Sequence, residues 1–93
     1  YPASAATGAL ITELREQRGL RQRDIEGLSE RHVRRIEQGI ARLTGDSAGK
    51  LAGAFGLGLD EFLLHVASAV AADRSADAEG TVQEAHQSSR SRS

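Results

Sequence analysis

The chain contains no cysteine, no methionine and no tryptophan among its 93 residues, and only one proline. Without cysteine, disulfide bonds and zinc or iron–sulfur sites held by thiolates are excluded. The three histidines, His32, His65 and His86, are too widely spaced to predict a metal site by themselves. We therefore expect no cofactor. Because position 1 is not methionine, we also expect the chain to be a processed or excised piece.

Long hydrophobic runs are also missing. The stretch nearest to membrane length, residues 57–72, is interrupted by Asp60, Glu61 and His65, which makes it too short and too polar to span a bilayer. The first residues, YPASAATGAL, lack the basic start and the long apolar core of a signal peptide. These features predict a chain that is cytoplasmic and does not bind membranes.

Charge of one sign does not dominate, since 12 Lys and Arg stand against 13 Asp and Glu for a net charge of −1. This balance excludes a chain that is basic throughout and coats nucleic acid without selectivity. The charges are nevertheless uneven. Residues 1–43 hold eight arginines and six acidic residues, residues 44–72 hold one lysine and three acidic residues, and the remainder holds three arginines and four acidic residues.

The composition predicts one small domain with two unstructured ends. From residue 73 onward Val82 is the only large apolar side chain, and serine is frequent. Such a segment buries too little apolar surface to offset the backbone entropy lost on folding, about 1–2 kcal/mol per residue. We therefore expect residues 73–93 to be a disordered tail, residues 1–6 to be disordered as well, and residues 7–72 to form the domain.

Within residues 7–72 the apolar side chains recur with helical spacing, and no run of strand length alternates between apolar and polar residues. Thr7 is the predicted N-cap of a first helix, which ends at Gly19 in a left-handed conformation. A short second helix is expected over residues 22–26, followed by a turn at Gly27 and Leu28. The inward-facing side chains predicted for the helices are Leu10, Ile11, Leu14, Ile25, Val33, Ile36, Ala48, Leu51, Ala52 and Phe55.

Capping residues define the remaining helices. Ser29 is expected to cap a third helix over residues 30–38, and Thr44 is expected to cap a fourth that ends at Gly56. A fifth helix is expected to start at Leu57, with two acidic residues in its first turn. Five short helices with tight connections predict an all-α fold, a compact five-helix bundle.

The third predicted helix has two inward residues and an otherwise polar exterior rich in arginine. An arginine near the start of a helix can enter the major groove of DNA and donate two hydrogen bonds to guanine. A capped, arginine-rich helix that follows a turn and another short helix is the arrangement of a helix-turn-helix reader. The alternative is a solvated face, with Glu30 and Arg34 forming an ordinary i, i+4 pair. Pattern and charge alone leave both readings open.

Three segments in order carry a resemblance to a known family: LREQRGLRQ at 14–22, LSERHVRRIEQG at 28–39 and KLAGAFGLGLDEFL at 50–63. Over Ala9 to Leu64 the chain resembles the phage-repressor-like (Cro/XRE-type) helix-turn-helix family. The resemblance implies a lambda-repressor-like fold and binding of double-stranded DNA. It assigns base reading to Glu30, Arg31, His32 and Arg35 and backbone contacts to Gln22, Arg34, Gln38 and Arg42. It also implies a structural ion pair between Arg15 and Glu37.

The sequence departs from the family pattern at two places. The second helix and its turn, from Gln22 to Ser29, are about three residues shorter than usual for the family, which alters how the third helix is presented. Arg21 stands where the family normally has a serine or threonine cap, at an expected cost of about 1 kcal/mol.

The fifth helix is a candidate dimer interface because its apolar residues cover more than one stripe. A homodimer is favoured because the mildly basic domain neutralises few phosphates, and family members commonly bind two half-sites as dimers. The alternative is that some of these side chains are scattered exposed apolar residues. The interface candidates are Phe62, Leu63, Leu64, Val66 and Val70.

Two functions remain in competition. The first is a bacterial-type DNA-binding transcriptional regulator, with a repressor favoured, associated with the nucleoid. The second is a protein-interaction module, such as an antitoxin-like or partner-binding fragment that docks through the tail or the fifth helix. An enzyme is not expected, because the sequence shows no nucleophile–base pair, no paired carboxylates and no phosphate-binding glycine loop.

Overall fold

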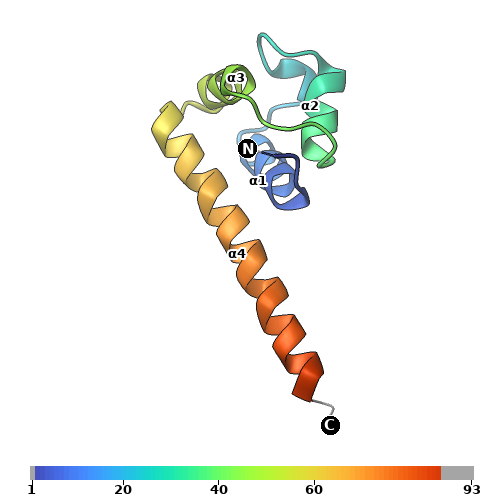
Figure 1. Cartoon of the computed structure of the whole chain (residues 1–93). Coiled ribbons are helices and arrows are strands. Elements are labelled where there is room, and N and C mark those ends of the chain that lie inside the picture. Colours follow the sequence, from blue (N-terminus) through green and yellow to red (C-terminus); the bar gives the residue numbers. More distant parts are fainter. Residues whose placement is uncertain (1, 87–93) are drawn as a thin grey trace.

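The structure, a computed structural model, describes residues 2–86, with side chains described for residues 2–74. Within the described part of the chain the order of elements is α1 (Ala5–Gln17), a 3-10 turn η1 (Gln22–Asp24), α2 (Glu30–Glu37), α3 (Gly45–Phe55) and α4 (Leu59–His86) (Figure 1). The prediction of an all-α fold is confirmed. The prediction of five α-helices is wrong, because the shortened second element forms a single 3-10 turn and leaves four.

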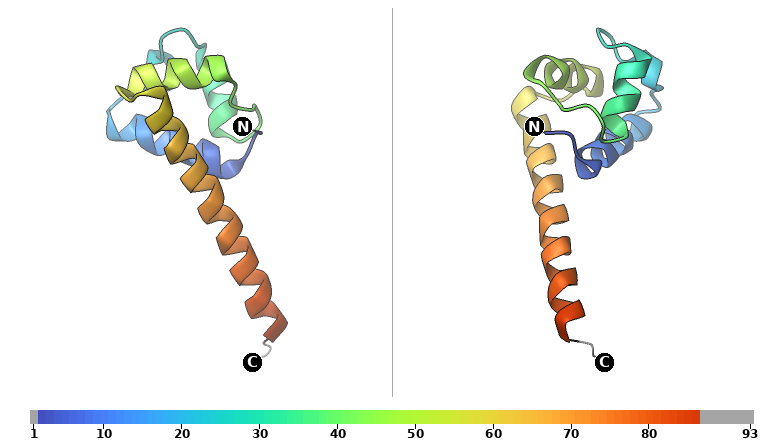
Figure 2. Two further views of the ribbon diagram at one scale, coloured as in Figure 1. Left: turned by 60° about the vertical axis from the view of Figure 1, so that its left-hand side comes forward. Right: turned by 45° about the vertical axis from the view of Figure 1, so that its right-hand side comes forward.

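Helix α1 lies at the centre of the packing and contacts both α2 and α4, while α3 packs across the start of α4 and η1 lies beside α2. Both views in Figure 2 show the first part of α4 against the other helices and its later part running away from them. The molecule is therefore elongated, measuring 51 × 24 × 23 Å along its principal axes.

The hydrophobic core contains residues from all four helices, together with Ile25, which directly follows η1. Phe55 of α3 and Phe62 of α4 are its largest members, with ring centroids 6.0 Å apart and planes tilted by 57°. Burying a side chain of this size contributes about 1.5–3 kcal/mol. The buried apolar residues are Ile11, Leu14, Ile25, Val33, Ile36, Leu43, Ala48, Leu51, Ala52, Phe55, Phe62 and Val66. All of the predicted inward residues are among them except Leu10, which is partly buried against the same core.

Two of the three predicted N-caps are confirmed. The Ser29 hydroxyl accepts the His32 N–H at 3.1 Å at the start of α2, and the Thr44 hydroxyl accepts the Ser47 N–H at 3.2 Å at the start of α3. The prediction for α1 is wrong, since its N-cap is Ser4 and its first residue is Ala5. Thr7 is buried in the first turn and donates its N–H to the Ser4 hydroxyl at 3.1 Å. Both residues are good caps, and the earlier one buries Thr7 inside the helix.

The expected disorder at the two ends is corrected in part. Residues 5 and 6 belong to α1, and residues 73–86 continue α4 rather than forming a tail. Once the first turns of α4 are fixed by packing, each further residue adds a hydrogen bond without a new nucleation cost, and the alanines of this segment favour helix. Residue 1 and residues 87–93, for which disorder was also expected, lie outside the described residues.

No single helix in the described part of the chain is long and apolar enough to cross a membrane. Helix α3 together with residues 59–74 of α4 passes the same test of length and composition as a pair, but the two are bent by 105° at the break between them.

Candidate nucleic-acid interface

Helix α2 is anchored by two side chains and exposes the rest of its surface. Val33 and Ile36 are 0% and 1% exposed, so one side of the helix is fixed in the core. On the other side Arg31, Arg34 and Arg35 are all exposed. A short helix with a buried stripe and a cationic outer face can present guanidinium groups in a fixed orientation.

Arg34 has a partner within the protein, and this distinguishes it from Arg31 and Arg35. Arg34 lies 3.6 Å from the Glu30 carboxylate, with both side chains about half exposed. The guanidinium groups of Arg31 and Arg35 make no hydrogen bond or ion pair with any other described side chain. Because exposed pairs are worth about 0–1 kcal/mol, Arg34 can also exchange Glu30 for an external anion. The surface thus offers three guanidinium groups for binding.

The start of α2 carries the other residues expected to read bases. Glu30 is exposed in the first turn, and His32 is half-buried with its backbone N–H held by the Ser29 cap. The remaining N–H groups of a first helical turn point along the axis toward any approaching anion. The structure brings Glu30, Arg31, His32 and Arg35 together on this one helix, and their role as base readers stays a prediction.

The end of α2 and the following loop place two of the predicted backbone-contacting residues. Gln38 is exposed at the C-cap and donates its N–H to the Arg34 carbonyl at 2.9 Å. Gly39 has a φ of 77°, which turns the chain so that the Ile40 N–H reaches the Arg35 carbonyl at 2.9 Å. Arg42 is exposed on this loop. These residues extend the polar surface beyond the helix.

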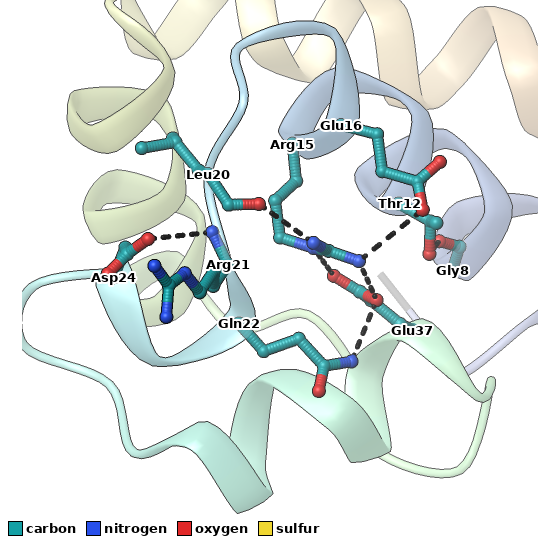
Figure 3. A network of polar contacts seen from close by, with 9 residues as sticks. All are labelled: Gly8, Thr12, Arg15, Glu16, Leu20, Arg21, Gln22, Asp24 and Glu37. Atoms are coloured by element: carbon teal, nitrogen blue, oxygen red, sulfur yellow. Dashed lines mark hydrogen bonds and ion pairs between the residues drawn. The ribbon is translucent and has the colours of Figure 1, made fainter.

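Arg15 of α1 and Glu37 of α2 form the ion pair that the resemblance implies (Figure 3). Arg15 Nε lies 2.7 Å from Glu37 Oε2, Arg15 Nη2 lies 3.2 Å from Oε1, and Arg15 Nη1 donates to the Leu20 carbonyl at 2.8 Å. The two side chains are only 13% and 7% exposed. A guanidinium that engages two carboxylate oxygens and a carbonyl fixes α1, α2 and the start of η1 in one arrangement.

The pair shifts the titration of both groups. Hydrogen bonding to Glu37 raises the pKa of Arg15, against the opposing effect of burial. Burial raises the pKa of Glu37, but hydrogen bonds from Arg15 and Gln22 outweigh it, so this pKa lies below its ordinary value. Both groups are therefore charged near neutral pH, as an orienting ion pair requires.

Gln22 has a partner within the protein. Its side-chain amide nitrogen donates to Glu37 Oε1 at 3.0 Å, and the residue is half-buried. The resemblance assigns Gln22 to the DNA backbone, and that role stays a prediction. What the structure gives is a hydrogen bond that ties η1 to the end of α2 (Figure 3).

The arginine at the cap of η1 is accommodated by a neighbouring carboxylate. Arg21 makes no side-chain capping bond, but its N–H donates to Asp24 Oδ2 at 2.8 Å, and the Asp24 N–H donates to the Arg21 carbonyl at 2.9 Å. The tight 3-10 turn therefore closes around Asp24. This is how a segment about one turn too short still connects α1 to α2.

The dimer-interface prediction needs a correction. Phe62 and Val66 are 0% exposed and belong to the core, so neither is available to another molecule. Leu63 and Val70 are partly buried against the same core, whereas Leu64 is 69% exposed. The wide apolar stripe has two sides because α4 packs on both α1 and α3.

Two residues that position the helices relative to one another, Gly8 and Arg18, were not predicted from the sequence. Gly8 is buried where α1 meets the end of α2, and a Cβ there would collide with the Glu37 carbonyl group. Arg18 donates from Nε to the Phe55 carbonyl at 2.7 Å and from Nη1 to the Leu14 carbonyl at 3.0 Å, and its guanidinium lies over the Phe55 ring. The only signal for Gly8 is its place three residues before Ile11, on the buried stripe of α1.

Helix α2 is short, capped and rich in exposed arginines, it follows η1 and a turn, and it is held against α1. This is the arrangement of a helix-turn-helix domain. A family model described as "Helix-turn-helix" matches residues 11–62, more than half of the chain. The chain belongs to this Cro/XRE-type family of DNA-binding domains. Comparison with curated proteins and with solved structures gives no match. No group of three or more possible metal ligands occurs among the described residues.

Proposed function

We propose that the protein is a sequence-specific DNA-binding transcriptional regulator, acting as a repressor, that inserts α2 into the major groove. The observation that carries the proposal is the pair of exposed guanidinium groups of Arg31 and Arg35, which have no partner among the described side chains, on a helix anchored by Val33 and Ile36. A rigid helix of this kind can aim bidentate hydrogen bonds at guanine, each worth about 1–3 kcal/mol of discrimination.

The proposed contacts with DNA divide into two sets of residues. In this proposal Glu30, Arg31, His32 and Arg35 face base edges. A second set of residues contacts phosphates, and these contacts orient the domain without reading sequence. The proposed phosphate contacts are Gln22, Arg34, Gln38 and Arg42.

The small net charge of the domain determines how we expect it to bind DNA. The first 43 residues carry an excess of only two positive charges, so few phosphates can be neutralised by one domain. Two domains on two half-sites add their contacts, and a homodimer is therefore part of the proposal. A bacterial-type regulator of this kind works in the cytoplasm, on the nucleoid.

Selection of bound duplexes from a random pool, followed by retardation assays, tests the proposal. Arg31→Ala and Arg35→Ala should each weaken binding to the selected duplex about tenfold or more, the loss of one good base contact. Lys50→Gln removes the same charge from α3, where the ammonium pairs with Asp46 at 2.9 Å, and it should bind like the parent.

The competing function makes the opposite prediction. If the chain is a protein-interaction module that docks through α4, Arg31→Ala and Arg35→Ala will behave like the parent chain. Enrichment of no common sequence from the pool, with the domain folded by circular dichroism, contradicts the proposed function.

A further inference from the structure

A hollow of about 360 Å³, here called the α1–α4 hollow, opens between the start of α1 and the middle of α4. The chain that leads into α1 forms one wall together with the first turn of that helix, and one face of α4 forms the other wall. A volume of this size lies within the range of sites that hold small molecules. The described wall residues are Pro2, Ser4 and Ala6 on the α1 side and Ala67, Val70 and Ala71 on the α4 side.

The walls of the α1–α4 hollow are small and mostly apolar. Three of the six wall residues are alanines, and Val70 is partly buried against the core. The Ser4 hydroxyl is already engaged, since it donates to Thr7 Oγ1 at 2.9 Å and accepts the Thr7 N–H at 3.1 Å. None of the described wall residues is aromatic, so the walls offer no ring for stacking. They therefore favour an aliphatic chain over an aromatic or polar group.

Two charged side chains, Asp73 and Arg74, lie at the end of the hollow. Both are exposed, and neither makes a hydrogen bond or ion pair with another described side chain. Arg74 is four residues after Val70 and three after Ala71, so it lies on the same face of α4 as the wall. A guanidinium binds a carboxylate through two parallel hydrogen bonds, and the neighbouring Asp73 carboxylate repels any second negative charge. This end of the hollow therefore suits one negative charge.

The length of the wall limits the length of the ligand. From Ala67 to Arg74 the helix rises about 10 Å, which is roughly the length of an extended eight-carbon chain. We infer that the α1–α4 hollow binds a small aliphatic monocarboxylate. Its chain lies along the α4 wall, and its carboxylate is held by Arg74. Binding at this site requires no DNA, so it goes beyond the proposed function.

Octanoate is the probe, and an NMR titration of the full chain shows where it binds. Octanoate should bind saturably with a Kd below about 1 mM. It should shift the amide signals of Ala6, Ala67 and Ala71, whereas that of Gly53 on α3 should not move. Octylamine has the same chain with a positive charge and should bind about tenfold more weakly, because Arg74 repels it. Shifts that do not saturate, or octylamine binding as tightly as octanoate, overturn the inference.

Two pairs of variants test the residues assigned to the site. Arg74→Gln should weaken octanoate binding about tenfold or more, because it removes the charged donor. Arg23→Gln removes the same charge from η1, away from the hollow, and should bind like the parent. Ala71→Leu should weaken binding to a similar degree by filling the hollow, whereas Ala72→Leu should not, since Ala72 lies about 100° further around α4.

All four substitutions change exposed side chains and favour or tolerate helix, so the variants should fold, as circular dichroism will show. Binding by Arg74→Gln or Ala71→Leu that equals binding by its control refutes the site. Since no DNA is present, this outcome is separate from failure of Arg31 and Arg35 to read sequence.

Discussion

Arg15 and Glu37, 22 residues apart in the sequence, meet through two parallel hydrogen bonds of 2.7 and 3.2 Å. The contact joins α1 to the last turn of α2, the helix that carries the exposed arginines. The Glu37 carboxylate also accepts from Gln22, so a single buried charge orients three elements. Buried pairs of this kind set geometry more surely than they add stability, but removing one partner leaves an uncompensated charge.

Arg15→Met should lower the free energy of unfolding by about 3 kcal/mol, because it leaves the nearly buried Glu37 carboxylate without its cation. For a domain of this size that corresponds to a fall in Tm of more than about 10 °C. Arg34→Met is the control, since it breaks the exposed pair with Glu30 and should cost no more than about 0.5 kcal/mol. Thermal unfolding followed by circular dichroism measures both. Similar losses from the two substitutions would contradict a special role for Arg15.

The stability of the domain should depend on the ionisation of Glu37. Its pKa is lowered in the folded state, so the stabilisation is complete above the unfolded value of about 4.3 and is lost as the pH falls through the folded value. Urea unfolding at pH 7, 5 and 3 should show the difference between the parent and Glu37→Gln shrinking toward the lowest pH. A difference that stays constant across this range would show that Glu37 does not contribute through its charge.

Glycine-to-alanine substitutions in two helices should have opposite signs. At Gly8 a Cβ would meet the backbone of Glu37 and lie 2.9 Å from the Ile36 carbonyl oxygen, so Gly8→Ala should cost about 1–3 kcal/mol by forcing α1 away from α2. At Gly49, in the interior of α3, a Cβ meets nothing within 4 Å. Gly49→Ala should therefore stabilise by up to about 1 kcal/mol through helix propensity. Chemical denaturation of both variants is the measurement, and a stable Gly8→Ala would mean that the two helices can separate freely.

Much of the fold could be predicted from local rules. Ser29 and Thr44 cap α2 and α3 as expected, because a hydroxyl before a helical apolar pattern has few other places to bond. The start of α1 was misplaced because Ser4 and Thr7 are both able to cap, and only packing decides that Thr7 is buried. The full length of α4 was not predicted, because composition indicates only how much surface a segment can bury. It does not show that the packed first turns of the same helix remove the nucleation cost for the residues that follow.

The candidate site, like the fold, could be predicted from the sequence only in part. The outward direction of Arg31 and Arg35 follows from the spacing of Val33 and Ile36, so sequence sufficed to predict it. The breadth of the α4 stripe could not separate core from interface, because Phe62 and Val66 are as apolar as Leu64. Which of them is covered depends on the angle at which α1 and α3 meet α4. Gly8 and Arg18 were not recognised for a related reason, since their importance lies in contacts with residues that are distant in sequence.

Arg42 and Arg31 should affect DNA binding in different ways if one contacts phosphate and the other contacts a base. Arg42→Ala should weaken binding to all duplexes by a similar factor and reduce the slope of log affinity against log salt by about one. Arg31→Ala should weaken the selected duplex most and relax the preference at one base pair, at a cost of about 1–3 kcal/mol. Titrations at several salt concentrations, with a selected and a scrambled duplex, distinguish these effects. Since both substitutions remove one exposed guanidinium, equal changes in slope and in preference would show that charge alone governs binding at this surface.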